Sequence, residues 1–132
     1  MKRVEIKNCS WSDERGWGIE PVDASGLDRK ELGNLHVVSL KPGKIRANHY
    51  HPDATEWLLV MGGPVKIAWR LCNEDAIHEK IMEGVEPALF EIPPNTMHAI
   101  QNISENLIYL MAFNNCHKYN TIGCSPLIDE DK

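Results

Sequence analysis

The sequence predicts an all-β fold, either a sandwich or a closed barrel, with about eight short strands. Apolar runs of strand length recur at intervals of roughly eight to twelve residues along the chain. The segments between them are rich in Gly, Pro, Asn and Asp, which are the residues that tight turns favour. No stretch has the 3.6-residue periodicity of a convincing amphipathic helix.

The expected elements follow in order along the chain. Val4 and Ile6 alternate with charged residues, so the N-terminus is expected to form an edge strand. Asp13–Gly16 is a turn, and 21–33 is a charged loop with room for one helical turn. Further strands are expected over 35–40, 56–61, 65–71, 76–82, 88–92, 98–103 and 107–113.

Length and composition bound the organisation of the chain. The 132 residues predict one domain, with a core at about 33–113, an N-terminal strand and loop at 1–32 and a polar tail at 114–132. The sequence leaves open whether the tail wraps a partner subunit or is mobile. The net charge of −5 argues against a nucleic-acid-binding surface. No apolar run reaches signal-peptide or membrane-span length, so a cytoplasmic location without membrane contact is expected.

Two histidines and a glutamate form the first notable motif. In the stretch GKIRANHYHPDATEWLLVMGG, His49 and His51 are separated by one residue, so on an extended strand their side chains point to the same face. Glu56 lies at an odd step from His51, but Pro52 and Asp53 break the strand between them. The next strand can therefore present Glu56 toward the two imidazoles.

A second motif, PPNTMHAIQN, places His98 just after a turn at Pro94 and Asn95. Three imidazoles and one carboxylate form a plausible ligand set for one divalent transition metal. The donors are compatible with Zn, Fe, Mn, Ni or Cu. Without a cation, Glu56 would be a costly carboxylate facing an apolar interior.

The two motifs resemble the paired signature motifs of the cupin superfamily. Each is a set of residues at characteristic spacings. The first set matches at Gly43, His49, His51, Glu56 and Gly63. The second set matches at Pro93, Asn95, His98 and Asn102.

Asn95 stands where the cupin family usually has glycine. Asparagine is the next residue most tolerant of positive φ, so the turn is expected to survive. The resemblance covers about residues 33–113 and implies the cupin double-stranded β-helix, a jelly-roll barrel. It implies that the metal ligands are His49, His51, Glu56 and His98, that a small molecule binds in the barrel, and that the protein is a homodimer. Val4 and Ile6 are where the dimer contact is expected.

Further residues are candidates for the lining of the barrel pocket. Residues on the inward face near the ligands would lie beside a bound molecule, and the candidates are Arg46, Trp69, Ile100 and Tyr109. His36, His78 and His117 are instead interpreted as ordinary surface or hydrogen-bonded histidines. A ligand set of four leaves two octahedral positions for water, oxygen or an oxygen-rich ligand.

Three functions remain open from the sequence. The run DERG at Asp13–Gly16 and the segment Arg46–Tyr50 resemble sugar-nucleotide epimerases and ketoisomerases, which are themselves cupins. The chain resembles more closely a metal-binding cupin domain of capsular-polysaccharide enzymes, which implies isomerase or epimerase chemistry at a metal-polarised carbonyl. A metal-dependent dioxygenase and a non-catalytic module that binds a small ligand are the alternatives, because the fold does not determine the function.

Overall fold

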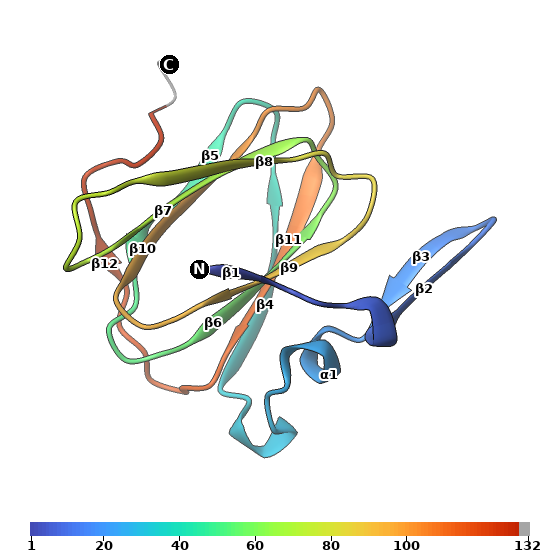
Figure 1. Ribbon diagram of the computed structural model, residues 1–132, viewed down its shortest axis with the longest axis horizontal. Helices are drawn as coiled ribbons and strands as arrows, with labels where there is room; N and C mark the ends of the chain where they lie inside the picture. Colours follow the sequence, from blue (N-terminus) through green and yellow to red (C-terminus); the bar gives the residue numbers. More distant parts are fainter. Residues whose placement is uncertain (130–132) are drawn as a thin grey trace.

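The computed structural model describes residues 1–129 and confirms the all-β fold (Figure 1). Two five-stranded antiparallel sheets form the barrel. The first sheet has the order β1 (Lys2–Val4), β9 (Ala88–Ile92), β6 (Glu56–Met61), β11 (Ile108–Asn114) and β4 (Asn34–Leu40). The second sheet has the order β12 (Ile122–Gly123), β5 (Ile45–Tyr50), β10 (Thr96–Asn102), β7 (Val65–Leu71) and β8 (His78–Met82).

Strand β6 shows how the alternation of side chains builds the interior. Glu56, Leu58 and Val60 point into the barrel, where Leu58 and Val60 belong to the main apolar core. Trp57 and Leu59 point to the outer face, where they pack with Leu89 and Phe113. Both faces of this strand are buried, as the continuous run EWLLVM predicts.

Residues 1–33, which we call the N-terminal segment, cover part of the outer face of the first sheet. This segment contains the 3-10 helices η1 (Lys7–Cys9) and η2 (Arg29–Glu31) and the short helix α1 (Pro21–Ser25). Its apolar residues pack against the Trp57 cluster, and they include Val4, Ile6, Ile19, Val22, Leu27 and Leu32. The segment therefore replaces solvent over one side of the sheet, which stabilises the barrel by burying apolar surface.

Two expectations for the N-terminus are refined by the structure. β1 is an edge strand, but Val4 and Ile6 are half-buried against the chain's own outer cluster, so much of their apolar surface is already covered. The Asp13–Gly16 turn is the tip of a hairpin, β2 (Ser10–Asp13) with β3 (Gly16–Ile19), that projects from the barrel (Figure 1). The alternation within this hairpin is short and mostly exposed, so the sequence pattern for its strands is weak.

The tail runs back across the barrel instead of leaving it. We call residues 115–128 the C-terminal segment; the last three residues of the predicted tail, 130–132, lie outside the described part. Gly33 permits its close passage, because a Cβ at that position would overlap the backbone of Cys116. Within 1–129, no helix is long and apolar enough to cross a membrane.

Candidate metal centre

A bulge in β5 aims the first histidine of the motif. Ala47 and Asn48 both have positive φ, of 75° and 55°, and the register of β5 against β10 shifts by one residue here. The extra residue is Asn48, since Ala99 pairs with Ala47 while His98 pairs with His49. The bulge therefore brings His49 directly opposite His98.

His51 lies just beyond the end of β5, and Glu56 begins β6. The Pro52–Thr55 turn reverses the chain between them, as the sequence predicts. His98 is fully buried in β10, three residues after Asn95, whose φ of 60° confirms the expected left-handed turn. Side chains from β5, from the residue just after it, from β6 and from β10 thus converge on one cluster.

The four side chains form a compact cluster. One potential donor atom from each of His49, His51, Glu56 and His98 lies within 4.8 Å of those of the other three. The ring centroid of His49 lies 4.8 Å from the ring centroids of both His51 and His98. The Nε2 of His51 is 2.6 Å from Glu56 Oε2, and the Nε2 of His98 is 3.9 Å from the same oxygen.

Backbone carbonyls fix the orientation of two of the imidazoles. The Nδ1 of His98 lies 2.9 Å from the carbonyl oxygen of Thr96, and the Nδ1 of His51 lies 3.0 Å from that of Asn120. A carbonyl can only accept a hydrogen bond, so both Nδ1 atoms carry the proton. Both Nε2 atoms therefore point toward the centre of the cluster, in the arrangement that metal-bound histidines use.

The pKa values of the three clustered histidines shift in different directions. Burial, with the nearby His98 and His51, lowers the pKa of His49 to about 4. Burial also lowers the pKa of His98. Burial disfavours the charged form of His51, but its hydrogen bonds to Glu56 and to the Asn120 carbonyl outweigh that effect and raise its pKa. Burial likewise opposes ionisation of Glu56, but the hydrogen bond from His51 and the adjacent imidazoles lower its pKa.

The cluster fits a divalent transition metal. The Nε2 of His98 is buried and has no hydrogen-bond partner among the described residues, which is costly for a polar atom unless something coordinates it. Glu56 supplies a carboxylate that is only 9% exposed, and a cation would neutralise it. Three imidazole nitrogens and one carboxylate oxygen are donors that suit zinc, iron, manganese, nickel and copper.

Two small cavities adjoin the cluster. One, of about 130 Å³, is lined by His49, Glu56 and His98 together with Arg46 and Ile100, which were both predicted from the sequence. The other, of about 100 Å³, is lined by His49, His51 and Glu56 and by residues of the C-terminal segment. His36 lines both cavities.

The structure places the two other pocket candidates elsewhere. Tyr109 is 49% exposed, because Leu110 and Ala112 take the inward positions of β11 and leave Tyr109 on the outer face. Trp69 packs half-buried against the core and stacks on His78, with ring centroids 5.4 Å apart. Neither residue lines either cavity beside the cluster.

The sequence analysis missed four residues at the site. His36 occupies the inward row of β4 with Val38 and Leu40, and this alternation was the available signal. The other three come from the C-terminal segment and carry no sequence signal. They are Tyr119, Asn120 and Thr121, which all lie against His51.

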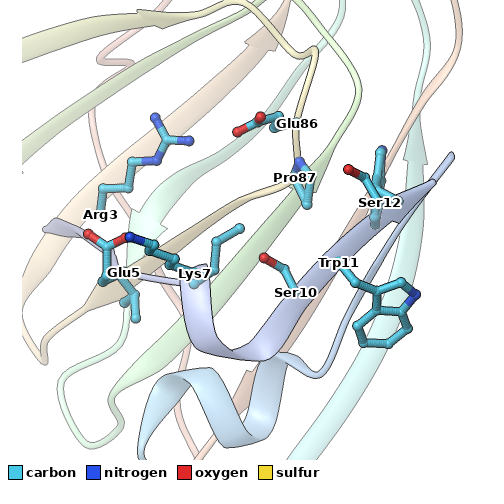
Figure 2. Close-up of a pocket in the computed structure, with 11 residues that line it drawn as sticks. Arg3, Glu5, Lys7, Ser10, Trp11, Ser12, Glu86 and Pro87 are labelled. Carbon is cyan, nitrogen blue, oxygen red and sulfur yellow. The ribbon is translucent and has the colours of Figure 1, made fainter.

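A larger groove, of about 660 Å³, is lined by a different set of residues (Figure 2). The N-terminal strand, the β2–β3 hairpin and the loop at 86–87 form it. Its charged lining is mixed, with Arg3 and Lys7 against Glu5 and Glu86. It contains none of the four clustered donors, so its size does not make it the centre of the chemistry.

Comparison with models of protein families shows which family the chain belongs to. Residues 11–122 match the model of the polysaccharide biosynthesis C-terminal domain. The chain belongs to this family. Its solved structural neighbours are cupins, which confirms the superfamily that the two motifs indicate.

Two curated relatives resemble this family member over most of its length. A UDP-2-acetamido-2,6-beta-L-arabino-hexul-4-ose reductase from Pseudomonas aeruginosa is 27% identical over 104 residues, which are 79% of this chain and 27% of the relative. A probable oxalate decarboxylase from Arthroderma benhamiae is 34% identical over 97 residues, covering 72% and 23% of the two chains. The chain therefore spans about a quarter of the length of each relative.

Three solved structures share the fold. The capsular polysaccharide assembling protein CapF of Staphylococcus aureus has a TM-score of 0.64 and 26% identity, over 71% of this chain and 27% of CapF. The 3,4-ketoisomerase QdtA of Thermoanaerobacterium thermosaccharolyticum has a TM-score of 0.64 and 20% identity, over 90% and 85%. NovW, a 4-keto-6-deoxy sugar epimerase of Streptomyces spheroides, has a TM-score of 0.70 and 15% identity, over 98% and 76%. At their low identities, QdtA and NovW support the fold alone.

Proposed function

We propose that this cupin is the metal-binding unit of an enzyme of carbohydrate metabolism, which acts on a nucleotide-linked keto sugar as an epimerase or isomerase. The observation that carries the proposal is that three of the four clustered donors, His49, Glu56 and His98, line the 130 Å³ cavity. A ligand oxygen in that cavity would lie beside the cluster. The polysaccharide biosynthesis family and the sugar-nucleotide reductase among the relatives support the substrate class.

The size of the cavity limits what it can enclose. Sites for whole small molecules usually measure roughly 300–1,000 Å³, so about 130 Å³ admits only the reacting end of a ligand. The nucleotide would remain outside the barrel. Arg46 is exposed at this mouth, and its Nε donates to the Ser39 carbonyl at 2.9 Å, which leaves the outer guanidinium nitrogens able to bind a phosphate.

The chain's own residues account for the remaining requirements. A bound divalent cation would supply Lewis acidity toward a carbonyl oxygen of the ligand. Val38, Leu58 and Ile100 line the cavity with apolar surface and exclude water from the reacting end. His36 is the imidazole of the lining that does not belong to the cluster, and we assign it the movement of the proton.

The proposed step is a proton transfer beside the carbonyl. His36 takes a proton from the carbon next to the carbonyl group, and the electron pair of that C–H bond moves toward the carbonyl oxygen. Delivery of a proton to the opposite face of that carbon by solvent water, while His36 keeps the proton that it took, gives an epimer. Proton return at a different atom gives a ketoisomer, so one arrangement of residues serves both outcomes.

The test is solvent deuterium exchange. Metal content is first measured by elemental mass spectrometry, and the loaded protein is then incubated in D₂O with a UDP- or TDP-linked 4-keto-6-deoxy sugar. We expect deuterium at the carbon beside the carbonyl, measured by NMR, and loss of this exchange when a chelator removes the metal. Stoichiometric metal without exchange would contradict the isomerase proposal. Metal-dependent O₂ uptake would then favour the oxygenase alternative, and ligand binding alone would favour a binding module.

A second candidate is cleavage of a small carboxylate. The similarity to a probable oxalate decarboxylase and the small cavity with Arg46 at its mouth favour it. Incubation of the metal-loaded protein with oxalate, followed by measurement of released CO₂, distinguishes the two. We expect no release, and release that depends on Arg46 would replace the first proposal by the second.

A further inference from the structure

The C-terminal segment surrounds the side of His51 that faces away from Glu56, although it contributes none of the four donors. The carbonyl oxygen of Asn120 lies 3.0 Å from His51 Nδ1, and Thr121 Oγ1 lies 3.2 Å from the same atom. Tyr119 meets the imidazole edge-on, with ring centroids 5.1 Å apart. Three consecutive residues of the segment thus contact one imidazole.

The barrel anchors this part of the segment at Asp53. The carboxylate of Asp53 accepts hydrogen bonds from the backbone N of Asn120 at 3.0 Å and from its Nδ2 at 2.9 Å. Beyond Thr121, β12 pairs with β5, where Ile122 lies opposite Tyr50. These contacts hold the Asn120 carbonyl in place from both sides.

The far end of the segment is anchored independently. Asn48 accepts a hydrogen bond from the backbone N of Leu127 at 2.8 Å and donates one to the carbonyl of Ile128 at 3.2 Å. Ile128 is 5% exposed and packs on Ala68 and Ala99, on the outer face of the second sheet. The segment is therefore docked along its length and is not a loose tail.

We propose that the C-terminal segment is part of the metal centre, with Asn120 and Thr121 as positioning residues that hold His51 in the orientation and tautomer required of a ligand. This inference rests on the metal binding in the proposed function, and it does not depend on the substrate. An imidazole whose Nδ1 proton is held by a fixed carbonyl presents its Nε2 lone pair in a fixed direction. Because the coupling is reciprocal, metal binding also stabilises the docked segment.

The first test measures metal affinity in variants that loosen the segment without altering a donor. Asp53→Ala removes the anchor of Asn120, and we expect Zn²⁺ affinity, measured by competition with a chromophoric chelator, to fall by about 10-fold or more. Thr121→Val should weaken binding less, and Thr121→Ser, which keeps the hydroxyl, should bind like the wild type. Melting temperatures in a chelator provide the control, since a merely structural role would lower them and leave the Zn²⁺ affinity unchanged.

The second test reads the docking of the segment directly. Lys118 is exposed within it, so trypsin cleavage after this residue, followed by mass spectrometry, reports its release. We expect Zn²⁺ to slow this cleavage and Asp53→Ala to speed it. Cleavage after Arg15, at the exposed tip of the β2–β3 hairpin, should be insensitive to Zn²⁺ and serves as the internal control.

The outcomes separate this inference from the proposed function. If the wild type binds Zn²⁺ but Asp53→Ala binds it equally well and Zn²⁺ does not slow cleavage after Lys118, the positioning role is wrong while the metal centre stands. If the wild type binds none of the five candidate metals, both the proposed centre and the positioning role are overturned. Failure of the deuterium-exchange test alone leaves this inference intact.

Discussion

The contact between Glu56 and His51 indicates where the cluster holds a proton. Glu56 Oε2 and His51 Nε2 are 2.6 Å apart, which is hydrogen-bond distance. His51 already donates from Nδ1 to the Asn120 carbonyl, so a hydrogen bond at Nε2 requires its doubly protonated form. The raised pKa of His51 and the lowered pKa of Glu56 agree with that assignment. In the metal-free protein, a proton on His51 therefore occupies the position that a cation would take.

This assignment predicts the pH dependence of metal binding. Because the pKa of His51 is raised above the usual 6.5, one proton must leave the cluster when metal binds at mildly acidic pH. His49, with a pKa of about 4, is already neutral there, and the pKa of His98 is also lowered. We expect Zn²⁺ affinity to fall about tenfold for each pH unit below the pKa of His51. Chelator competition between roughly pH 5 and 7 measures this slope.

The slope separates this cluster from a set of independent histidines. Three histidines with ordinary pKa values would each gain a proton over the same range, and the slope would approach three. A measured slope near three would mean that the cluster does not hold the proton on His51 alone.

His36 allows a sharp test of the proposed proton transfer. His36→Gln keeps a polar side chain at the exposed mouth but removes the imidazole, so we expect deuterium exchange to fall by roughly 100-fold or more. Metal content and ligand affinity should be unchanged, because His36 is not one of the four clustered donors. Tyr119→Phe is the matched control. It removes the hydroxyl group of Tyr119, a second residue that lines a cavity beside the cluster without belonging to it. Full exchange in His36→Gln would contradict the assignment.

At the scale of the element, much of the barrel could be predicted because its strands are buried and regularly spaced. The run at 56–61 and the turn residues around it correspond closely to β6 and its flanking turns. His49, His51, Glu56 and His98 converge as the alternation and the intervening turn predict. These features depend on local patterns, which a single sequence contains.

The parts that could not be predicted depend on contacts distant in the sequence. The contact of Asn120 with His51 joins residues 69 positions apart, and a backbone carbonyl leaves no mark in the sequence of its partner. At the bulge, Ala47 and Asn48 have positive φ although neither is glycine. No turn motif at these positions predicts that conformation. Tyr109 was assigned to the wrong face of β11. This strand carries apolar residues on both faces, among them Leu110 and Met111, so no alternation marks the inward positions.

Asn95 supports an energetic prediction for the turn before β10. Its φ of 60° is left-handed, and its backbone N donates to the His51 carbonyl at 3.0 Å while its carbonyl accepts from Cys72 at 2.9 Å. Asn95→Ala should lower the free energy of unfolding by about 1 kcal/mol, because alanine is strained there. Asn95→Gly should be neutral or stabilising. Urea denaturation of the metal-free protein measures both, and equal stability of the two variants would contradict the role of φ.

At the scale of the whole molecule, the sheet edges differ in how well they are protected. β12 and β1 are short, and β8 contains His78, Glu79 and Lys80. β4 is seven residues long, has no proline and only one titratable residue, and exposes Leu35 and Val37 on its outer side. Long apolar edge strands of this kind tend to pair with another chain.

We therefore propose that the protein forms a homodimer, as the cupin resemblance implies, and that the contact runs along β4 instead of at Val4 and Ile6. Val37→Lys places a charge on the apolar side of this edge, so it should convert the dimer to monomer, measured by size-exclusion chromatography with light scattering. Ile81→Lys, at a similarly exposed position on the already charged β8, is the control and should not change the mass. A dimer that survives Val37→Lys would place the interface elsewhere.

Gly33 has a consequence for how related barrels can diverge. The passage of the chain at Cys116 leaves no room for a side chain at position 33, and the backbone N of Gly33 also donates to the Asn114 carbonyl at 2.8 Å. In a homologue with any other residue there, the backbone at the position of Cys116 would have to move to make room for the side chain. The missing side chain at position 33 is thus a condition for a tail that passes this close to β4 and continues to the second histidine of the first motif.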